Sequence, residues 1–203
     1  MGDVERAVAA IRSGQPVILP TDTVYGLCAT PDREEPVALV YRLKQRPETV
    51  PAALMCSDLE VLFERVPELR GSSGVIARAL LPGPYTLIFP NPAGRYPWLN
   101  GLAPETIGVR VPVLDGPARA VLEQVGAVTA TSANRHGGPE PRRLADVPAE
   151  IREACAAEID AGELPGVPST VLDLTGAEPK VVREGAVPAA EALARLSAAR
   201  AAQ

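Results

Sequence analysis

Stretches with helical spacing alternate with short apolar runs along almost the whole chain, and this alternation restricts the fold more than any other feature. Apolar residues at helical spacing predict helices over residues 3–13, 33–46, 58–66, 74–81, 116–125 and 189–203. Short apolar runs predict strands over residues 16–20, 51–56, 85–89, 106–112, 127–131, 169–175 and 180–184. Some connections between strands are too short for a crossover helix, so we expect a mixed parallel and antiparallel sheet. The pattern therefore predicts an α/β fold with flanking helices, and the sequence has no long linker or internal repeat, which predicts a single domain over residues 1–203.

Composition narrows the class of protein. Hydrophobic residues make up 46% and charged residues 22% of the sequence, as in ordinary globular proteins. The net charge of −5 argues against a protein that coats nucleic acid, although a local basic pocket remains compatible with it. Cys28, Cys56 and Cys155 are far apart and include no CxxC pair, so a disulfide framework is not expected. The sequence shows no signal peptide and no long apolar run. Together with the cysteine pattern, this leads us to expect a cytoplasmic protein without a membrane segment.

Polar residues directly follow a strand in "VILPTDTVYGL", residues 17–27. Thr21, Asp22 and Thr23 are residues that readily form turns and helix caps. The same residues would suit a ligand site, because open α/β sheets bind ligands where their strands end. Both interpretations remain open at this point.

Two basic residues, Lys44 and Arg46, stand at the end of a predicted helix. A helix C-terminus favours cations, so a solvated cap would explain them. However, the chain has 18 arginines and only two lysines, Lys44 and Lys180. A compact ammonium beside a forked guanidinium would suit the several oxygens of a polyphosphate.

A third group of polar residues lies in or beside later strands. Arg110 faces the same side of its strand as Gly108, which suggests either an anion bound above the sheet or an edge strand with its polar side in water. Ser132 and Asn134 could bind a nucleotide or cap a helix. The single histidine, His136, lies in a Gly-rich loop, where we expect it to be solvated rather than a catalytic base. Neither GxGxxG nor GxxxxGK[ST] is present, and no residue is predicted to bind a metal as a protein ligand.

The ordered set "PTDTVYGL", "KQRP", "LPGPYT", "GVRVP", "TSAN…GG", "PSTV" and "REG" resembles the YrdC family of threonylcarbamoyl-AMP synthases. The resemblance covers about residues 15 to 185 and is closest to the short, single-domain form. It implies a twisted mixed sheet around a concave, positively charged pocket. It also implies a nucleotidyltransferase that makes threonylcarbamoyl-AMP and pyrophosphate from L-threonine, bicarbonate and ATP, with Mg²⁺. Partner proteins would then use the product to modify position 37 of tRNA, with transient tRNA contact by this chain possible.

The resemblance also implies roles for individual residues. Those implied to contact threonine are Thr23, Arg110, Ala130 and Ser169. Those implied to contact ATP are Lys44, Arg46, Thr106, Ser132, Asn134, Glu140 and Arg183, with Lys44 and Arg46 also expected to act in catalysis. Val50 and Met55 depart from the pattern, since many members carry Asn or Lys at the first position and long members often carry His at the second. A paralogue that binds nucleotide or RNA without making the adenylate, and a carbamoyl-transfer module that uses carbamoyl phosphate, remain the alternatives.

Overall fold

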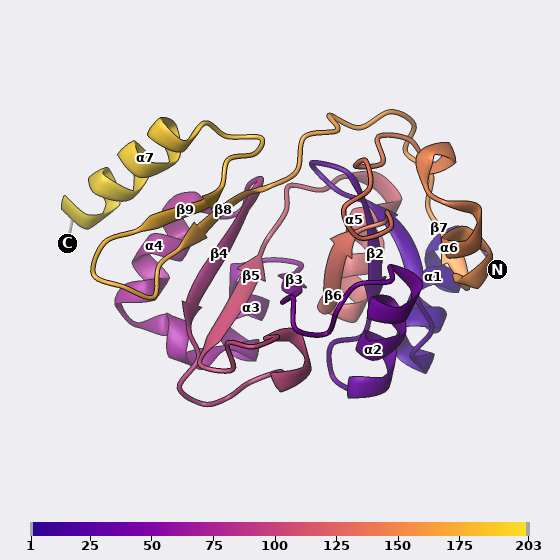
Figure 1. Cartoon of the computed structure of the whole chain (residues 1–203), viewed down its shortest axis with the longest axis horizontal. Helices are drawn as coiled ribbons and strands as arrows, with labels where there is room; N and C mark the ends of the chain where they lie inside the picture. The colour runs from indigo at the N-terminus through magenta and orange to yellow at the C-terminus, as the bar shows by residue number, and fades with distance from the viewer. Residues whose placement is uncertain (1, 202–203) are drawn as a thin grey trace.

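The computed structural model of the protein describes residues 2–201, and within them nine strands form one mixed sheet (Figure 1). The strands are β1 (Val17–Pro20), β2 (Tyr25–Ala29), β3 (Ala53–Cys56), β4 (Tyr85–Pro90), β5 (Thr106–Arg110), β6 (Ala127–Ser132), β7 (Ala157–Glu158), β8 (Thr170–Asp173) and β9 (Lys180–Arg183). Their order across the sheet is β7-β1-β2-β6-β3-β5-β4-β8-β9. The pairs β1–β7, β3–β5 and β4–β8 are parallel, and the other neighbouring pairs are antiparallel. The predicted mixed α/β sheet is therefore confirmed.

Helices cover the sheet in two groups, one on each half of the molecule in Figure 1. The helices are α1 (Asp3–Ser13), α2 (Glu34–Leu43), α3 (Leu59–Arg65), α4 (Ser72–Leu80), α5 (Gly116–Val125), α6 (Ala149–Ala154) and α7 (Ala189–Ala201), with short 3₁₀ turns η1 (Pro67–Arg70), η2 (Pro97–Leu99) and η3 (Leu144–Asp146). α3 lies beside β3, α4 beside β4 and α7 beside α4, whereas α1, α2 and α5 lie beside β1, β2, β6 and β7, with α6 beside α2. Within the first group, α4 packs against α7, and within the second, α1 packs against α5.

The largest apolar core lies on one face of the β4–β5 pair. Leu87 and Phe89 of β4 and Ile107 and Val109 of β5 are at most 1% exposed and belong to this core. Side chains alternate between the two faces of a strand, so the residues between them point to the opposite face. That opposite face is free of helices from the first group and carries the polar residues described below.

β2 was not predicted from the sequence, although it is one of the central strands. All five of its residues are buried, so it has no apolar–polar alternation that could mark a strand. β2 pairs with β1 in an antiparallel hairpin, and residues 21–24 form the connection. The Thr21 hydroxyl accepts a hydrogen bond from the Val24 backbone N–H at 3.2 Å and donates to the Val24 carbonyl at 2.7 Å. The polar residues after β1 therefore do form a turn, as one of the two interpretations expected.

Other differences concern the ends of elements and short segments. The helix predicted over residues 33–46 ends at Leu43, and the strand predicted over 106–112 ends at Arg110. α6 and β7, of six and two residues, were not predicted because a periodicity cannot be recognised over so few residues.

Cys28, Cys56 and Cys155 are free thiols, which agrees with the expectation of no disulfide framework. Across residues 2–201, no helix combines the length and the apolar character that crossing a bilayer requires.

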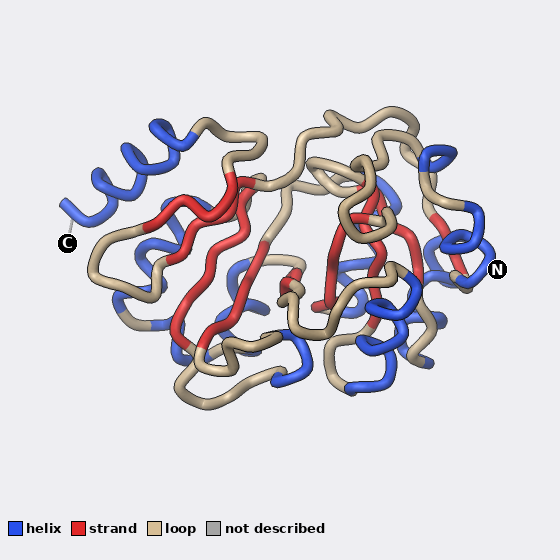
Figure 2. Tube along the Cα trace, viewed as in Figure 1, coloured by secondary structure: helices blue, strands red, loops and turns tan. Residues whose placement is uncertain are grey.

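A long connection links the two halves of the molecule. Residues 159–169 run from β7, at one edge of the sheet, to β8, which lies second from the other edge. Figures 1 and 2 show this segment as a loop that passes over the top of the molecule. The backbone N–H of Gly166 donates to the Thr23 carbonyl at 2.8 Å, so the connection is attached to the β1–β2 turn. It delivers Ser169 to the start of β8.

Candidate ligand site

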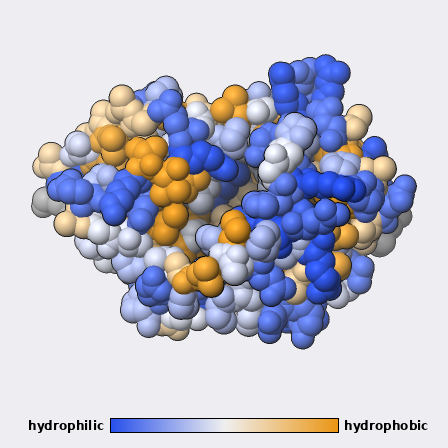
Figure 3. All heavy atoms as spheres, viewed as in Figure 1, coloured by the Kyte–Doolittle hydropathy of each residue, from blue (hydrophilic) through white to orange (hydrophobic). Residues whose placement is uncertain are grey.

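A cavity of about 560 Å³ opens between the two halves, and Figure 3 shows the molecule hollowed there. This volume is in the usual range for a site that binds a small molecule or cofactor. Every residue that the family resemblance assigned to a substrate lies on its lining. These residues are Thr23, Lys44, Arg46, Thr106, Arg110, Ala130, Ser132, Asn134, Glu140, Ser169 and Arg183. The structure therefore brings together, in one cavity, side chains spread over 160 residues of sequence.

The floor of the cavity is the face of β4 and β5 opposite the apolar core. Thr86, Gly108 and Arg110 line it from β4 and β5, alternating with the residues that enter the apolar core. Because Gly108 has no side chain, the cavity reaches the backbone of β5 beside Arg110. β5 lies between β3 and β4, and Arg110 is only 8% exposed, so the interpretation of this strand as a solvated edge was wrong.

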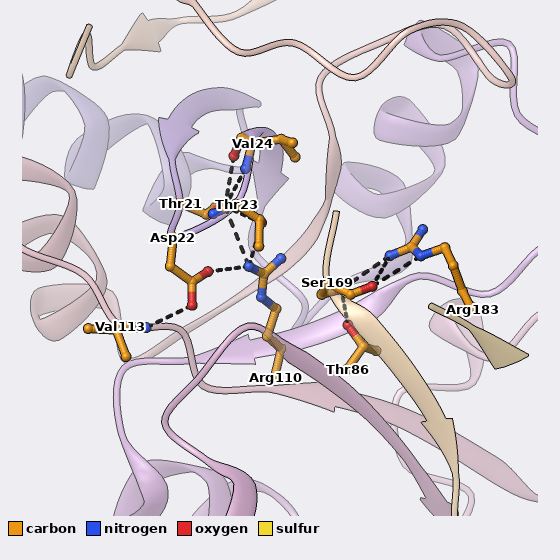
Figure 4. Close-up of polar contacts among 9 residues, drawn as sticks. All are labelled: Thr21, Asp22, Thr23, Val24, Thr86, Arg110, Val113, Ser169 and Arg183. Carbon is orange, nitrogen blue, oxygen red and sulfur yellow. Dashed lines mark hydrogen bonds and ion pairs between the residues drawn. The ribbon is translucent and has the colours of Figure 1, made fainter. Parts of the chain in front are cut away.

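Arg110 is held by the turn between β1 and β2 (Figure 4). Its Nη2 forms an ion pair with Asp22, donates to the Thr23 hydroxyl at 2.7 Å and lies 3.5 Å from the Thr21 hydroxyl. The Nε of Arg110 is buried and has no hydrogen-bond partner among the described residues. One terminal nitrogen of this guanidinium is therefore anchored, while Nε has an unused N–H donor.

A second polar chain crosses the cavity near β8 (Figure 4). The Thr86 and Ser169 hydroxyls lie 2.8 Å apart. Arg183 donates from Nε and Nη2 to the Ser169 carbonyl, at 3.1 and 2.9 Å, and from Nη2 to the Ser169 hydroxyl at 3.2 Å. Burial is the main cause that lowers the pKa of Arg183 from its usual value. This chain joins the Ser169 side of the cavity to a guanidinium at its rim.

Lys44 is 1% exposed and lies where β6 ends. Its ammonium donates to the Ser132 carbonyl, to the Asn134 carbonyl at 2.7 Å and to the Asn134 Oδ1 at 2.8 Å. The Asn134 Oδ1 also accepts from the Ser132 hydroxyl at 2.6 Å, and its Nδ2 donates to the Gly138 carbonyl at 2.7 Å. Burial, and secondly the charge of Arg46, lower the pKa of Lys44 to about 8. Lys44 therefore holds the 132–138 loop and adds positive charge to the cavity at neutral pH.

Arg46 fastens the segment that follows α2 to the sheet. Its guanidinium donates to the carbonyls of Val50 and Pro51 and to the Thr131 hydroxyl, the last at 3.3 Å. Burial is the largest cause lowering the pKa of Arg46. The solvated-cap interpretation of Lys44 and Arg46 was wrong, because both side chains line the cavity.

Several cavity residues were missed by the sequence reasoning. Thr86 and Thr131 line the cavity with hydroxyl groups, although each stands in a stretch that the sequence predicts only as a strand. His136, expected to be a solvated loop residue, is exposed but also lies on the lining. The polar face of a strand cannot be recognised as a site until the partner strands are known, and this explains the omissions.

The two positions that depart from the family pattern differ in location. Val50 lines the cavity, as expected. Met55 is fully buried in the apolar core formed with α1 and α5, and it is not on the lining. The expectation that Met55 faces the site was wrong, because β3 passes from the cavity wall at Ala53 into this core at Met55.

The fold and the site define an α/β protein whose sheet carries a cationic ligand cavity, formed by Lys44, Arg46, Arg110 and Arg183. The family model named Sua5/YciO/YrdC, with the description "Telomere recombination", matches residues 9–185. The chain therefore belongs to the Sua5/YciO/YrdC family.

Named relatives and solved structures agree with this assignment. A Mycobacterium tuberculosis protein is 33% identical over 89% of this chain and 83% of its own length. The threonylcarbamoyl-AMP synthase of Pyrococcus abyssi is 33% identical over 91% of this chain and 54% of its own length. The crystal structure of P. abyssi Sua5 complexed with L-threonine superposes with a TM-score of 0.86 at 31% identity, over 95% of this chain and 56% of that one. This chain thus spans just over half the length of the Pyrococcus protein.

Proposed function

We propose that this protein is a threonylcarbamoyl-AMP synthase, which condenses L-threonine, bicarbonate and ATP into threonylcarbamoyl-AMP and pyrophosphate. Such a reaction would make it a nucleotidyltransferase. The observation that carries the proposal is the presence of two anion-binding regions in one cavity. Arg110 with its surrounding hydroxyls forms one region, and Lys44, Arg46 and Arg183 contribute the other. The L-threonine bound to the Pyrococcus relative supports the same activity.

On the threonine side, Arg110 would bind the substrate carboxylate with its available donor. Thr23 and Ser169 would offer hydroxyl groups to the amino acid, and Ala130 would form a small apolar wall beside it. Both hydroxyl residues are at most 3% exposed, so bulk water competes little for them. A guanidinium suits this task because its planar donors match a carboxylate.

On the nucleotide side, Lys44, Arg46 and Arg183 would surround the triphosphate, with Thr106, Ser132, Asn134 and Glu140 beside the nucleotide. In the proposed reaction, the threonine amine takes up carbon dioxide from bicarbonate, and a carbamate oxygen attacks the α-phosphorus while pyrophosphate leaves. This chemistry needs no protein nucleophile. The chain's residues would act by positioning the two substrates and by stabilising the charge that develops on phosphate.

Mg²⁺ fits this cavity as a companion of ATP. Proteins commonly bind Mg²⁺ through one or two carboxylates together with substrate phosphates. Among the lining residues described, Glu140 is the acidic one, and its Oε2 is buried without a hydrogen-bond partner. Glu140 would hold the ion, which would neutralise part of the phosphate charge. Residues 2–201 contain no cluster of three or more metal-ligating side chains, so most of the ligands would come from ATP and water.

The product would pass to partner proteins that modify position 37 of tRNA. The arginines near the 134–140 loop are already paired, Arg135 with Glu150 and both Arg142 and Arg143 with Glu163. Together with the net charge of −5, these pairs favour transient rather than lasting contact with tRNA.

Pyrophosphate release tests the proposal when threonine, bicarbonate, ATP and Mg²⁺ are omitted in turn. We expect release only from the complete mixture. Lys44→Ala and Arg46→Ala should each slow it about 10²-fold, the usual effect of removing one charge-stabilising group. Lys180→Ala is the matched control, since Lys180 is exposed at the start of β9.

Other outcomes would support the alternatives. Equal release without threonine would indicate a nucleotide hydrolase. Turnover with carbamoyl phosphate in place of threonine and bicarbonate would indicate a carbamoyl-transfer module. Nucleotide binding without any turnover would indicate a non-catalytic paralogue.

A further inference from the structure

Asp22 lies between two residues of the cavity lining but is not itself part of that lining. Its carboxylate points toward Arg110 (Figure 4). One oxygen pairs with Nη2 of Arg110, and the other accepts a hydrogen bond from the backbone N–H of Val113 at 3.1 Å. Both oxygens are therefore occupied by the protein, which leaves Asp22 no evident role as a ligand for substrate.

The ion pair between Asp22 and Arg110 is buried. The two side chains are each only 10% exposed, whereas the side chains of the other ion pairs in the described structure are all at least 27% exposed. Removing one partner of a buried ion pair leaves the other charge uncompensated, so the Asp22 carboxylate strongly restricts where the Arg110 guanidinium can lie. Asp22 is also the one carboxylate within ion-pair distance of Arg110 among residues 2–201.

The pair orients the guanidinium as well as neutralising it. Asp22, Thr21 and Thr23 all approach Nη2, so this nitrogen of the planar group is held by the β1–β2 turn. Nε has no partner. Because the guanidinium is rigid and planar, fixing Nη2 also fixes the direction of the Nε–H bond.

We propose that Asp22 is a positioning residue, which holds Arg110 so that its free donor meets the carboxylate of the amino-acid substrate. This inference rests on the proposed function. The opposite effect is physically conceivable, since the Asp22 carboxylate also competes with the substrate carboxylate for the charge of Arg110. When Asp22 loses its charge, the affinity for threonine should fall if Asp22 positions Arg110 and should rise if Asp22 competes with the substrate.

The test compares the binding of L-threonine and L-threoninamide, in which a neutral amide replaces the carboxylate. Calorimetry is carried out on the wild type, Asp22→Asn and Asp22→Ala. A hydrogen bond to a charged group is worth about 10- to 100-fold in affinity, so we expect the wild type to prefer threonine by such a factor. In both variants the preference should fall at least about tenfold, through weaker threonine binding and nearly unchanged threoninamide binding. The KM for threonine should rise similarly, with kcat and the KM for ATP changed less than about twofold.

Two further variants keep the test independent of any folding defect at position 22. Val113→Pro removes the N–H that anchors Asp22 but leaves both charges, and it should lower the preference in the same direction by a smaller factor. Glu68→Gln breaks the exposed pair with Arg95 and should leave the preference unchanged.

Tighter threonine binding by Asp22→Asn would mean that Asp22 acts as a competitor, and would overturn the inference. An equal loss of affinity for both compounds would mean a general structural role, and would overturn it as well. A wild type that binds neither compound would instead overturn the proposed function itself, and the inference with it.

Discussion

Lys44 is the most deeply buried charged residue of the cavity, and its ammonium is already fully hydrogen-bonded within the protein. Its three acceptors are carbonyl and amide oxygens, which carry no formal charge to offset its own. This explains why burial lowers the pKa of Lys44 to about 8 although Glu140 acts in the opposite direction. The residue is therefore partly deprotonated under mildly alkaline conditions.

ATP affinity should consequently decrease as the pH rises above about 8. The charged ammonium is the form that attracts phosphate, and it predominates below this pKa and disappears above it. Calorimetric titration with ATP from pH 6.5 to 9.5 should show the dissociation constant rising by up to about tenfold per pH unit on the alkaline side. Lys44→Arg keeps its charge throughout this range and should remove most of the dependence. Parallel curves for wild type and variant would contradict this assignment.

Val50 and Met55 give a paired prediction, because only Val50 reaches the cavity. Val50→Asn adds a hydrogen-bonding side chain at the lining and should lower the KM for ATP several-fold, since one hydrogen bond is worth about 1 kcal/mol. kcat should be nearly unchanged.

Met55→His places an imidazole in an apolar core, so it should lower the midpoint of thermal unfolding rather than improve threonine binding. Steady-state kinetics and thermal denaturation of both variants measure these effects, and a lower KM for threonine in Met55→His would contradict the location of Met55.

Among the elements, the end of α2 determines how Lys44 and Arg46 reach the cavity. The backbone N–H groups of Gln45 and Arg46 bond to the carbonyls of Arg42 and Tyr41, and Gln45 has a φ of 52°. This is the Schellman arrangement, in which the residue in the left-handed conformation is usually glycine. The chain therefore changes direction sharply at Gln45, after the end of α2. Lys44 and Arg46, on either side of Gln45, turn toward the sheet.

Gln45→Gly should stabilise the protein. A non-glycine residue in the left-handed region costs about 1–2 kcal/mol, of which glycine's greater unfolded-state entropy offsets about 0.5–1 kcal/mol. We therefore expect the free energy of unfolding to rise by about 0.5–1 kcal/mol in chemical denaturation, with the activity retained. Gln45 is exposed, so no packing is lost. Gln45→Ala serves as the control and should give no comparable gain.

The sequence predicted the elements that carry periodic patterns, and the residues to which the family motifs assign a substrate all lie on the cavity lining. Their roles stay predictions. The sequence did not predict β2, whose five buried residues show no alternation, nor the role of Thr86, a single hydroxyl in an apolar strand. The contact between Asp22 and Arg110 joins residues 88 positions apart, and only the pairing of distant strands brings them together. Local patterns thus reveal elements and motifs, whereas contacts between them depend on the assembled sheet.

For the whole molecule, the burial of Cys28 and Cys56 and the partial burial of Cys155 predict how slowly the intact fold reacts with thiol reagents. Burial raises the pKa of Cys28, Cys56 and Cys155 to about 12 in each case, so very little thiolate exists at pH 8. In the native protein all three should react with a thiol reagent at least about 10²-fold more slowly than in denaturant. Ser197→Cys, at an exposed position of α7, provides a reactive reference in the same fold. Reaction of Cys28 or Cys56 as fast as this reference would show that the core opens locally.

The sheet order has a consequence for the chain during its synthesis. β1 pairs with β7 from much later in the sequence, and the cavity is closed by Ser169 and Arg183 near the end of the described chain. A nascent polypeptide on the ribosome therefore cannot complete the cavity until residue 183 has emerged from the exit tunnel. Earlier segments must wait for distant strands before they can pair, which makes the final closure of the sheet slow compared with the formation of local helices. A premature stop before residue 183 would leave a polypeptide with most of the elements but without the complete cavity.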